Sequence, residues 1–202
     1  MSLTCPVCDS PVTRRDRDPT GRDAILIDCP HCGEFALSGA LEASLPNLRS
    51  RSTESSPKIS HALRRAAGAN ERPLFTTYTV DAVLQQPLPR PREQADLLVR
   101  WIAENVAGPG ETLWITHATH GAIVGARSPA GFELVLDHLF ETGLLTGNQS
   151  KSLGGGDSAH ATLSFAGWEQ YENLRRGSSV YRKAFMAMKF CDPVLDNVLE
   201  TV

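Results

Sequence analysis

The sequence predicts an α+β chain with four parts: a four-cysteine zinc ribbon, a helical connector, a winged-helix domain, and the first strand and helix of a further α/β domain. Two CxxC pairs predict the ribbon, and a series of helices followed by two strands around a glycine-rich tip predicts the winged helix. An apolar run followed by a helix start predicts the last part. We expect the parts to span 1–37, 38–91, 92–177 and 178–202.

The composition is typical of a globular chain and excludes a wholly disordered one. Apolar residues make up 41% and charged residues 21% of the 202 residues, and no apolar run is long enough to span a bilayer. The N-terminus has neither a basic start nor an apolar stretch, so we expect no secretory signal and a cytoplasmic protein. The net charge, 20 − 23 = −3, argues against a chain-wide attraction to polyanions.

The metal-ligand signal comes from four cysteines, Cys5, Cys8, Cys29 and Cys32. Two residues separate the members of each pair, a spacing that lets a tight turn aim both sulfurs at one point. Four thiolates at about 2.3 Å complete a tetrahedral shell and leave no position for water. We therefore predict one structural Zn²⁺ per chain at these residues, with no catalytic role.

Two alternatives for the CxxC pairs are a redox motif and disulfides. A redox motif needs a βαβ context, and disulfides need an export signal, neither of which the sequence predicts. About 35 residues cannot supply a core of their own, so metal binding would form part of the folding energy and a chelator would melt residues 1–37 first. We expect His31, between Cys29 and Cys32, to face solvent and Cys191 to be a small buried or edge thiol.

The segment around and after the cysteines predicts a strand and several short helices. Phe35 and Leu37 follow the second pair and are expected to pack on the metal turn. Turn residues and helix caps place the other elements. In order, these are a strand at 24–27, a helix over 39–47 capped by Ser38, an exposed loop at 49–58, a basic helix over 58–69, a helix from a Thr79 cap to Gln86 and a proline-rich linker at 87–91.

The winged-helix domain is predicted by apolar residues at helical spacing and by clear helix ends. Ser128-Pro129 is a typical helix start, and Gly143 is expected to end that helix. The apolar stripes consist of Leu98, Trp101, Ile102 and Val106, and then Phe132, Val135, Leu136, Leu139 and Phe140. The expected elements are helices over 93–107, 117–125 and 129–142, a strand beginning at 144–146, a tip over 150–158, a returning strand at 161–165 and a helix opened by Gly167-Trp168.

Charge argues against DNA reading by the helix over 129–142, which takes the recognition position. Its charges are Glu133, Asp137 and Glu141, and it has no Lys or Arg. An acidic stripe repels phosphates and forfeits counterion release, so we expect a structural spacer or a protein-contact module. Nucleic-acid binding through another face stays an alternative, although its arginines are interleaved with acids: Arg14, Arg15, Arg17, Arg49, Arg51, Arg64 and Arg65.

His117 and His120 form an HxxH pair that would share one face of a helix. Such a pair could bind a metal, but the one further ligand nearby in the sequence is Glu111. A helix cap and an exposed imidazole are the interpretation we favour for these two residues.

The last 25 residues carry a resemblance to a known family. The run over 184–190, followed by Asp192-Pro193 and Leu195-Asp196, resembles the first strand and helix of a nucleoside deoxyribosyltransferase-like domain, which is related to Toll/interleukin-receptor (TIR)-like folds. The whole arrangement is similar to that of uncharacterised bacterial zinc-ribbon and winged-helix proteins that lead into such a domain. The family's sheet and nucleophilic carboxylate have no counterpart in this sequence, so no catalytic residue is carried over. The alternative for 184–190 is a strand or helix that packs on the winged helix.

These observations favour a non-catalytic, zinc-stabilised module that senses, positions or docks a protein. The resemblance implies that it is the regulatory front part of a nucleoside- or nucleotide-processing protein, with a protein partner or its own C-terminal domain as the contact. The alternative is a transcription regulator that binds nucleic acid through the ribbon and the winged helix. An enzyme is not favoured, because no nucleophile, base and charge-stabilising group converge in the pattern, so we predict no catalytic or cofactor-binding residue.

Overall fold

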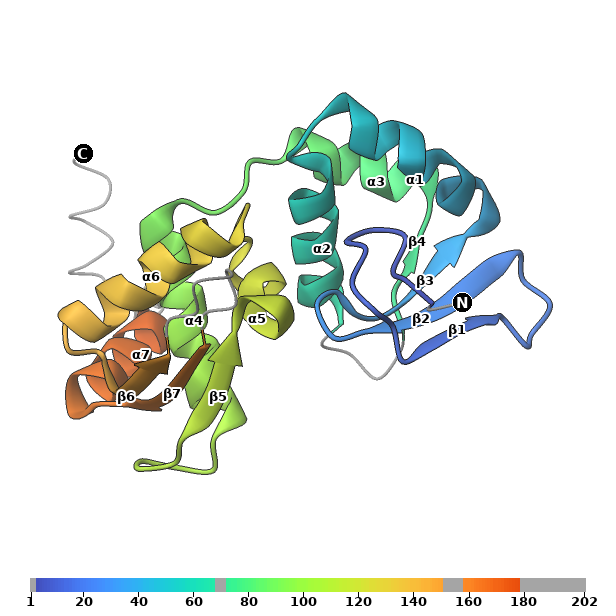
Figure 1. Ribbon diagram of the computed structural model, residues 1–202. Coiled ribbons are helices and arrows are strands. Elements are labelled where there is room, and N and C mark those ends of the chain that lie inside the picture. Colours follow the sequence, from blue (N-terminus) through green and yellow to red (C-terminus); the bar gives the residue numbers. More distant parts are fainter. Residues whose placement is uncertain (1–2, 68–71, 151–157, 179–202) are drawn as a thin grey trace, which may run out of the picture.

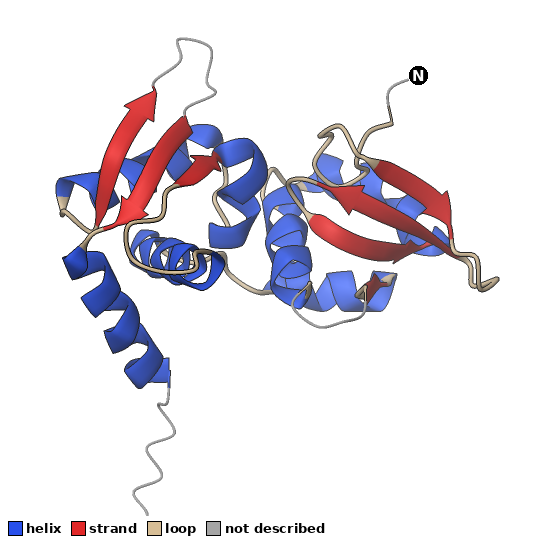
Figure 2. Ribbon diagram, turned by 90° about the horizontal axis from the view of Figure 1, so that it is seen from below, coloured by secondary structure: helices blue, strands red, loops and turns tan. Residues whose placement is uncertain are grey.

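The computed structural model describes residues 3–67, 72–150 and 158–178, which fold into two units joined by a short linker (Figure 1). Within these residues it contains seven helices and two sheets, which confirms the mixed α+β class. Figure 2 shows that each unit combines its own sheet with its own helices. No helix of the described residues is both long and apolar enough to cross a membrane.

The N-terminal unit is built on a four-stranded sheet in the order β1-β2-β3-β4. Its strands are β1 (Arg14–Arg17), β2 (Ala24–Cys29), β3 (Gly33–Ser38) and β4 (Leu74–Phe75). The predicted strand at 24–27 is confirmed as part of β2. The other three strands were not predicted, and β4 joins the sheet by parallel pairing with β3.

Three helices follow in the N-terminal unit: α1 (Gly39–Arg51), α2 (Ser55–Ala66) and α3 (Thr77–Gln85). Ser38 caps α1 as predicted, because its side chain accepts from the backbone N–H of Leu41. The exposed loop expected at 49–58 is wrong in extent, since α1 runs to Arg51 and α2 begins at a buried Ser55.

The cap of α3 lies three residues earlier than predicted. Thr76 accepts from the backbone N–H of Thr79, and the hydroxyl of Thr79 accepts from the backbone N–H of Thr76 in return. The two threonines thus form a capping box, in which Thr79 is the third helical residue rather than the cap.

One core joins the cysteines to the sheet and to all three helices. Phe35 and Leu37 are fully buried against the cysteine turns, as expected. Residues from the segment expected as a connector fill the rest of this core: Leu41, Leu45, Ile59, Leu63, Phe75 and Val80. The metal turns therefore pack on about 80 residues rather than standing alone.

The C-terminal unit follows the linker and has a second core of its own. Its three-stranded sheet is antiparallel with the order β5-β7-β6. Its elements are α4 (Pro91–Asn105), β5 (Leu113–Thr116), α5 (His117–Val124), α6 (Pro129–Glu141), β6 (Leu145–Ser150), β7 (Ser158–Leu163) and α7 (Phe165–Ser178). Every predicted helix of this unit is present within two residues of its expected ends, whereas β5 was not predicted.

The apolar stripes predicted for α4 and α6 face this core. Leu98 and Ile102 of α4 pack with Phe132, Val135 and Leu139 of α6, and all five are buried. The start of α6 is also as predicted, because the hydroxyl of Ser128 accepts from the backbone N–H of Gly131 at 3.2 Å.

The two units meet where α2 lies beside α5 (Figure 1). The His61 Nδ1 atom of α2 lies 2.8 Å from the carbonyl oxygen of Ala122 in α5. Arg127, after α5, pairs with Glu54 at 2.9 Å. Cys191 and the run over 184–190 lie outside the described residues, as does most of the predicted tip over 150–158.

Candidate metal centre

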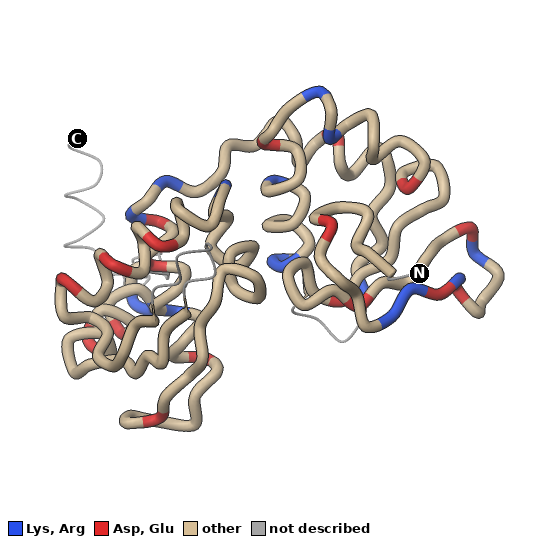
Figure 3. Tube along the Cα trace, viewed as in Figure 1, with Lys and Arg blue, Asp and Glu red and all other residues tan. Residues whose placement is uncertain are grey.

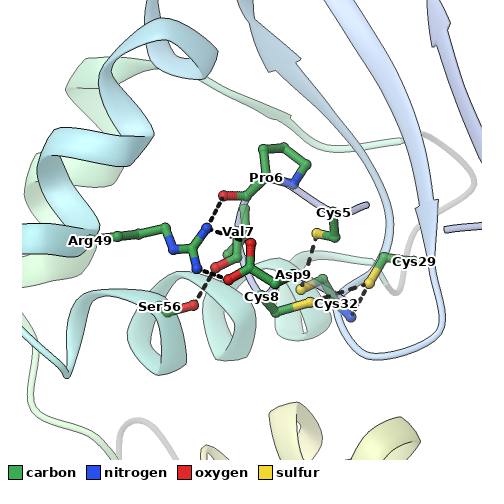
Figure 4. Close-up of polar contacts among 9 residues, drawn as sticks. All are labelled: Cys5, Pro6, Val7, Cys8, Asp9, Cys29, Cys32, Arg49 and Ser56. Carbon is green, nitrogen blue, oxygen red and sulfur yellow. Dashed lines mark hydrogen bonds and ion pairs between the residues drawn. The ribbon is translucent and has the colours of Figure 1, made fainter. Parts of the chain in front are cut away.

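The four cysteines come from two turns that the sheet of the N-terminal unit brings together. Cys5 and Cys8 lie in the loop before β1, and Cys29 and Cys32 bracket the tight turn between β2 and β3. Figure 4 shows their sulfurs pointing toward a common point. The structure thus brings together all four residues that the spacing singled out.

The distances between the sulfurs match a shared ion. The ligand atoms of all four cysteines lie within 4.8 Å of one another, with 3.5 Å between the sulfurs of Cys8 and Cys29 and 3.9 Å between those of Cys5 and Cys32. A tetrahedral site with metal–sulfur bonds of about 2.3 Å separates its sulfurs by about 3.8 Å. A disulfide would need about 2.05 Å, so these four cysteines are free thiols whose cluster could hold a metal ion.

The pKa values of the four thiols are shifted in opposite directions by their mutual hydrogen bonds and by burial. The pKa of Cys8 is lowered, chiefly by its hydrogen bond with Cys29, and the pKa of Cys29 is lowered by its hydrogen bond with Cys32. The pKa of Cys5 and that of Cys32 are raised, chiefly by hydrogen bonding with Cys29, and burial adds to both. A divalent cation would supply the charge that brings all four sulfurs into the thiolate form.

Two polar groups outside the four thiols contact the sulfurs. The backbone N–H of Cys32 donates to the sulfur of Cys29 at 3.4 Å. The hydroxyl of Ser60, a buried residue of α2, lies 3.2 Å from the sulfur of Cys32. When that sulfur is a thiolate, Ser60 is the donor and stabilises its charge. The sequence analysis did not identify Ser60 as a residue of the site. The available signal was its position next to Ile59 on the buried face of α2.

The first cysteine turn is held from outside by α1 and α2 (Figure 4). Arg49 of α1 donates to the carbonyl oxygen of Pro6 at 3.2 Å and forms a two-point ion pair with Asp9. The hydroxyl of Ser56 in α2 donates to the carbonyl oxygen of Val7. These contacts fix the backbone on both sides of Cys8. The shape of this turn therefore does not depend on its cysteine sulfurs alone.

The second cysteine turn is held by Arg64 of α2. Its Nε donates to the carbonyl oxygen of His31 at 2.9 Å, and its Nη2 donates to those of Pro30 and of Thr119, the latter at 3.1 Å. His31, which was expected to face solvent, is only partly exposed. Its Nδ1 lies 3.1 Å from the carbonyl oxygen of Ala118, because α5 packs directly on this turn.

The HxxH pair on α5 makes structural contacts instead of a metal site. The ring of His120 is buried, its Nδ1 lies 3.0 Å from the carbonyl oxygen of Thr116, and it packs edge-on against Trp101. His117 packs against the rings of His31 and Phe132. The cap of α5 is Thr116, so the expected exposed imidazole and histidine cap are both wrong.

The arginines considered for nucleic-acid binding are largely engaged within the protein. Arg14 pairs with Asp16 at 2.6 Å, and Arg15 pairs with Glu42 at 2.6 Å. Arg49 and Arg64 hold the two cysteine turns as described above. Figure 3 shows that basic and acidic positions are interspersed over the N-terminal unit.

Among the residues that the structure describes, the four cysteines are the one group of three or more potential ligands gathered around a point. Comparison with protein-family models, with curated proteins and with solved structures finds no match to this chain. The chemistry of the cluster follows from its donors: four sulfurs at tetrahedral separations can hold an ion and leave no open position for a substrate.

Proposed function

We propose that this chain is a non-catalytic module in which a structural zinc ion organises the N-terminal unit and positions the C-terminal unit for contact with a protein partner. The observation that carries this proposal is the closed cluster of Cys5, Cys8, Cys29 and Cys32. A complete shell of protein ligands stabilises a fold, whereas a catalytic site keeps a position for water or substrate.

The donor chemistry supports zinc as the ion. Four soft thiolates in tetrahedral geometry suit Zn²⁺ or an iron–sulfur centre, and they disfavour the hard cations Mg²⁺ and Ca²⁺. The turn between β2 and β3 places a backbone N–H on a sulfur, as the knuckles of a zinc ribbon do. We therefore assign a four-cysteine zinc ribbon to the start of the N-terminal unit.

The C-terminal unit is proposed to be a winged helix. Its order of helix, strand, helix, helix and two strands agrees with that fold, and so does the sheet order β5-β7-β6. In this fold α6 takes the position of the recognition helix. It carries Glu133, Asp137 and Glu141 and no Lys or Arg, which supports a protein contact over a phosphate contact.

The resemblance over 184–196 extends the proposal. A deoxyribosyltransferase-like domain after residue 178 would make this chain the regulatory front part of a nucleoside- or nucleotide-processing protein. Its partner would then be that domain or a second protein. The role that we propose for the module is to position its partner, and not to catalyse a reaction.

The first experiment measures metal content in the purified protein. We expect one zinc per chain by native mass spectrometry and by elemental analysis, and loss of that zinc in Cys32→Ser. The control is Cys191→Ser, which removes a cysteine that belongs to neither CxxC pair and should keep the metal. A wild-type protein with no bound ion, or with iron in its place, contradicts the zinc proposal.

The second experiment separates the protein-docking function from the nucleic-acid alternative. We expect no tight duplex DNA binding at about 50 mM salt, where phosphate contacts are strongest. Tight binding that falls steeply with salt, and that is abolished when Arg14, Arg15 and Arg17 are replaced together, would establish the alternative.

A further inference from the structure

We infer that metal binding at the four cysteines sets the placement of α5, and with it α6, through the turn that contains Cys29 and Cys32. The inference rests on the proposed metal centre. It adds that occupancy of this site by a metal ion controls how the two units are arranged relative to one another. The contacts that carry it run from the turn to α5 through Arg64 and His31.

Arg64 is the first link between the metal turn and the C-terminal unit. Its half-buried guanidinium donates to two carbonyls of the turn, those of Pro30 and His31, and to the carbonyl of Thr119 in α5. A guanidinium is planar and rigid, so all three acceptors must be in place together. Burial of the guanidinium lowers the pKa of Arg64.

His31 is the second link, and it reaches further into the C-terminal unit. Its Nδ1 lies 3.1 Å from the carbonyl oxygen of Ala118, and its ring lies 5.5 Å from that of His117. His117 in turn contacts the ring of Phe132, a core residue of α6, with 5.8 Å between centroids. A continuous series of side chains therefore joins the residue between two metal ligands to α6.

The β2–β3 ladder closes this turn at Cys29 and Gly33, and an ion shared by the sulfurs of Cys29 and Cys32 would add a further constraint on its shape. A shared ion would hold the sulfurs of Cys29 and Cys32 together and so present the carbonyls of Pro30 and His31 to Arg64 at fixed positions. Without the ion these carbonyls lose that constraint, and the guanidinium loses acceptors that compensate for its burial. Docking of α5 then weakens.

The C-terminal unit can move relative to the N-terminal unit without unfolding when the metal is lost, because its core contains no residue of the metal turns. Leu98, Phe132 and Leu139 pack within that unit alone. Loss of metal should therefore change where α5 and α6 lie relative to the N-terminal unit rather than whether they form.

The test compares Arg64→Ala with Arg65→Ala, both in the metal-loaded 202-residue chain. Arg65 is the neighbouring residue of α2 and is exposed, so it is a matched control. Hydrogen exchange of the α5 amides is expected to rise about tenfold in Arg64→Ala, the effect of losing one charged hydrogen bond, and to stay at the wild-type rate in Arg65→Ala. Core amides of α4 and α6 should keep wild-type rates in both variants.

Thermodynamic reciprocity supplies a second readout that does not depend on the docking measurement. If the metal favours docking, docking favours the metal, so Arg64→Ala should also bind zinc about tenfold more weakly in competition with a chelator. His31→Ala should show both effects if Arg64→Ala does not fold.

The outcomes distinguish this inference from the proposed function. Wild-type exchange in α5 together with wild-type metal affinity in the folded variants would overturn the coupling and leave the metal centre intact. A wild-type chain that binds no metal would overturn both. Raised exchange in α5 with unchanged core amides and weaker metal binding is the supporting result.

Discussion

The hydroxyl of Ser60 lies 3.2 Å from the sulfur of Cys32, and both residues are buried. Ser60 belongs to α2, which also contributes Ile59 and Leu63 to the core around the cysteines. A thiolate in such surroundings depends on nearby donors for the solvation that water would otherwise give. The contact therefore joins the packing of α2 to the charge state of a metal ligand.

Ser60→Ala should weaken metal binding without preventing it. Removing a donor to a charged sulfur costs about 1.5 kcal/mol, which corresponds to about a tenfold loss of affinity. Competition with a zinc chelator measures this directly. Ser50→Ala, which removes an exposed hydroxyl on α1, should retain wild-type affinity. Equal affinities for the two variants would show that Ser60 does not act on the sulfur.

Two leucines of α6 separate a buried position from an exposed one on the same helix. Leu139 is fully buried in the core, whereas Leu134 is 65% exposed. Leu139→Ala should lower the free energy of unfolding of the C-terminal unit by about 2–5 kcal/mol, because it leaves a cavity. Leu134→Ala should change it by less than about 0.5 kcal/mol. Urea denaturation followed by tryptophan fluorescence checks both, and similar losses would contradict the assignment of the core face.

The sequence predicted the features that depend on local spacing. Each CxxC pair is local in the chain. The prediction that the two pairs lie together followed from the four ligands that one metal ion needs. The stripes of α4 and α6 are equally local, since helical periodicity alone places Leu98, Val135 and Leu139 toward a core. Caps and breakers such as Ser128 set the ends of the helices with similar reliability.

The sequence analysis did not predict features that depend on contacts between segments far apart in the chain. β4 has two residues, and it becomes a strand because Ala36 and Leu37 of β3 pair with residues 74 and 75. The helices expected to be a connector share the core of the cysteine turns, which no periodicity within them could indicate. Arg64 was considered from the sequence as one of the arginines of a nucleic-acid-binding face, because a donor to backbone carbonyls leaves no pattern in the sequence.

His117 should make stability depend on pH. Burial and the nearby His31 lower the pKa of His117 to about 4, from the ordinary value of 6.5. The folded state therefore prefers the neutral ring, while the unfolded state takes up a proton below about pH 6.5. This contribution to stability is fully present above pH 6.5 and is lost as the pH falls from there toward 4.

The size of the pH effect is measured by comparing variants, because burial also lowers the pKa of His61 and that of His120. Between pH 7.5 and 5.5 the metal-loaded wild type should lose about 1 kcal/mol more than His117→Gln, a figure that allows for the ring being half-buried. Urea midpoints at the two pH values give this difference. His138→Gln, at an exposed position of α6, should follow the wild type, and a His117→Gln profile that also follows it would exclude the role of burial.

Gly147 of β6 should tolerate no side chain, in contrast to Gly143 at the end of α6. A Cβ on Gly147 would lie 2.0 Å from the carbonyl oxygen of His160 in the paired strand, and its φ of +135° also disfavours other residues. Gly143 has a φ of +71°, and a Cβ added there would meet no atom within 4 Å. Gly143→Ala should therefore cost about 1 kcal/mol, which is the strain of a left-handed residue alone.

Gly147→Ala should cost at least about 3 kcal/mol, because a backbone oxygen cannot move aside without opening the pairing of β6 with β7. Thermal and urea denaturation of the two variants provide the comparison, and hydrogen exchange at Ala161, which faces Gly147 across the ladder, locates the damage. Exchange should accelerate there in Gly147→Ala and stay unchanged in Gly143→Ala. If both substitutions cost the same, the close approach of β6 to β7 is absent in solution and strain at positive φ is the whole effect.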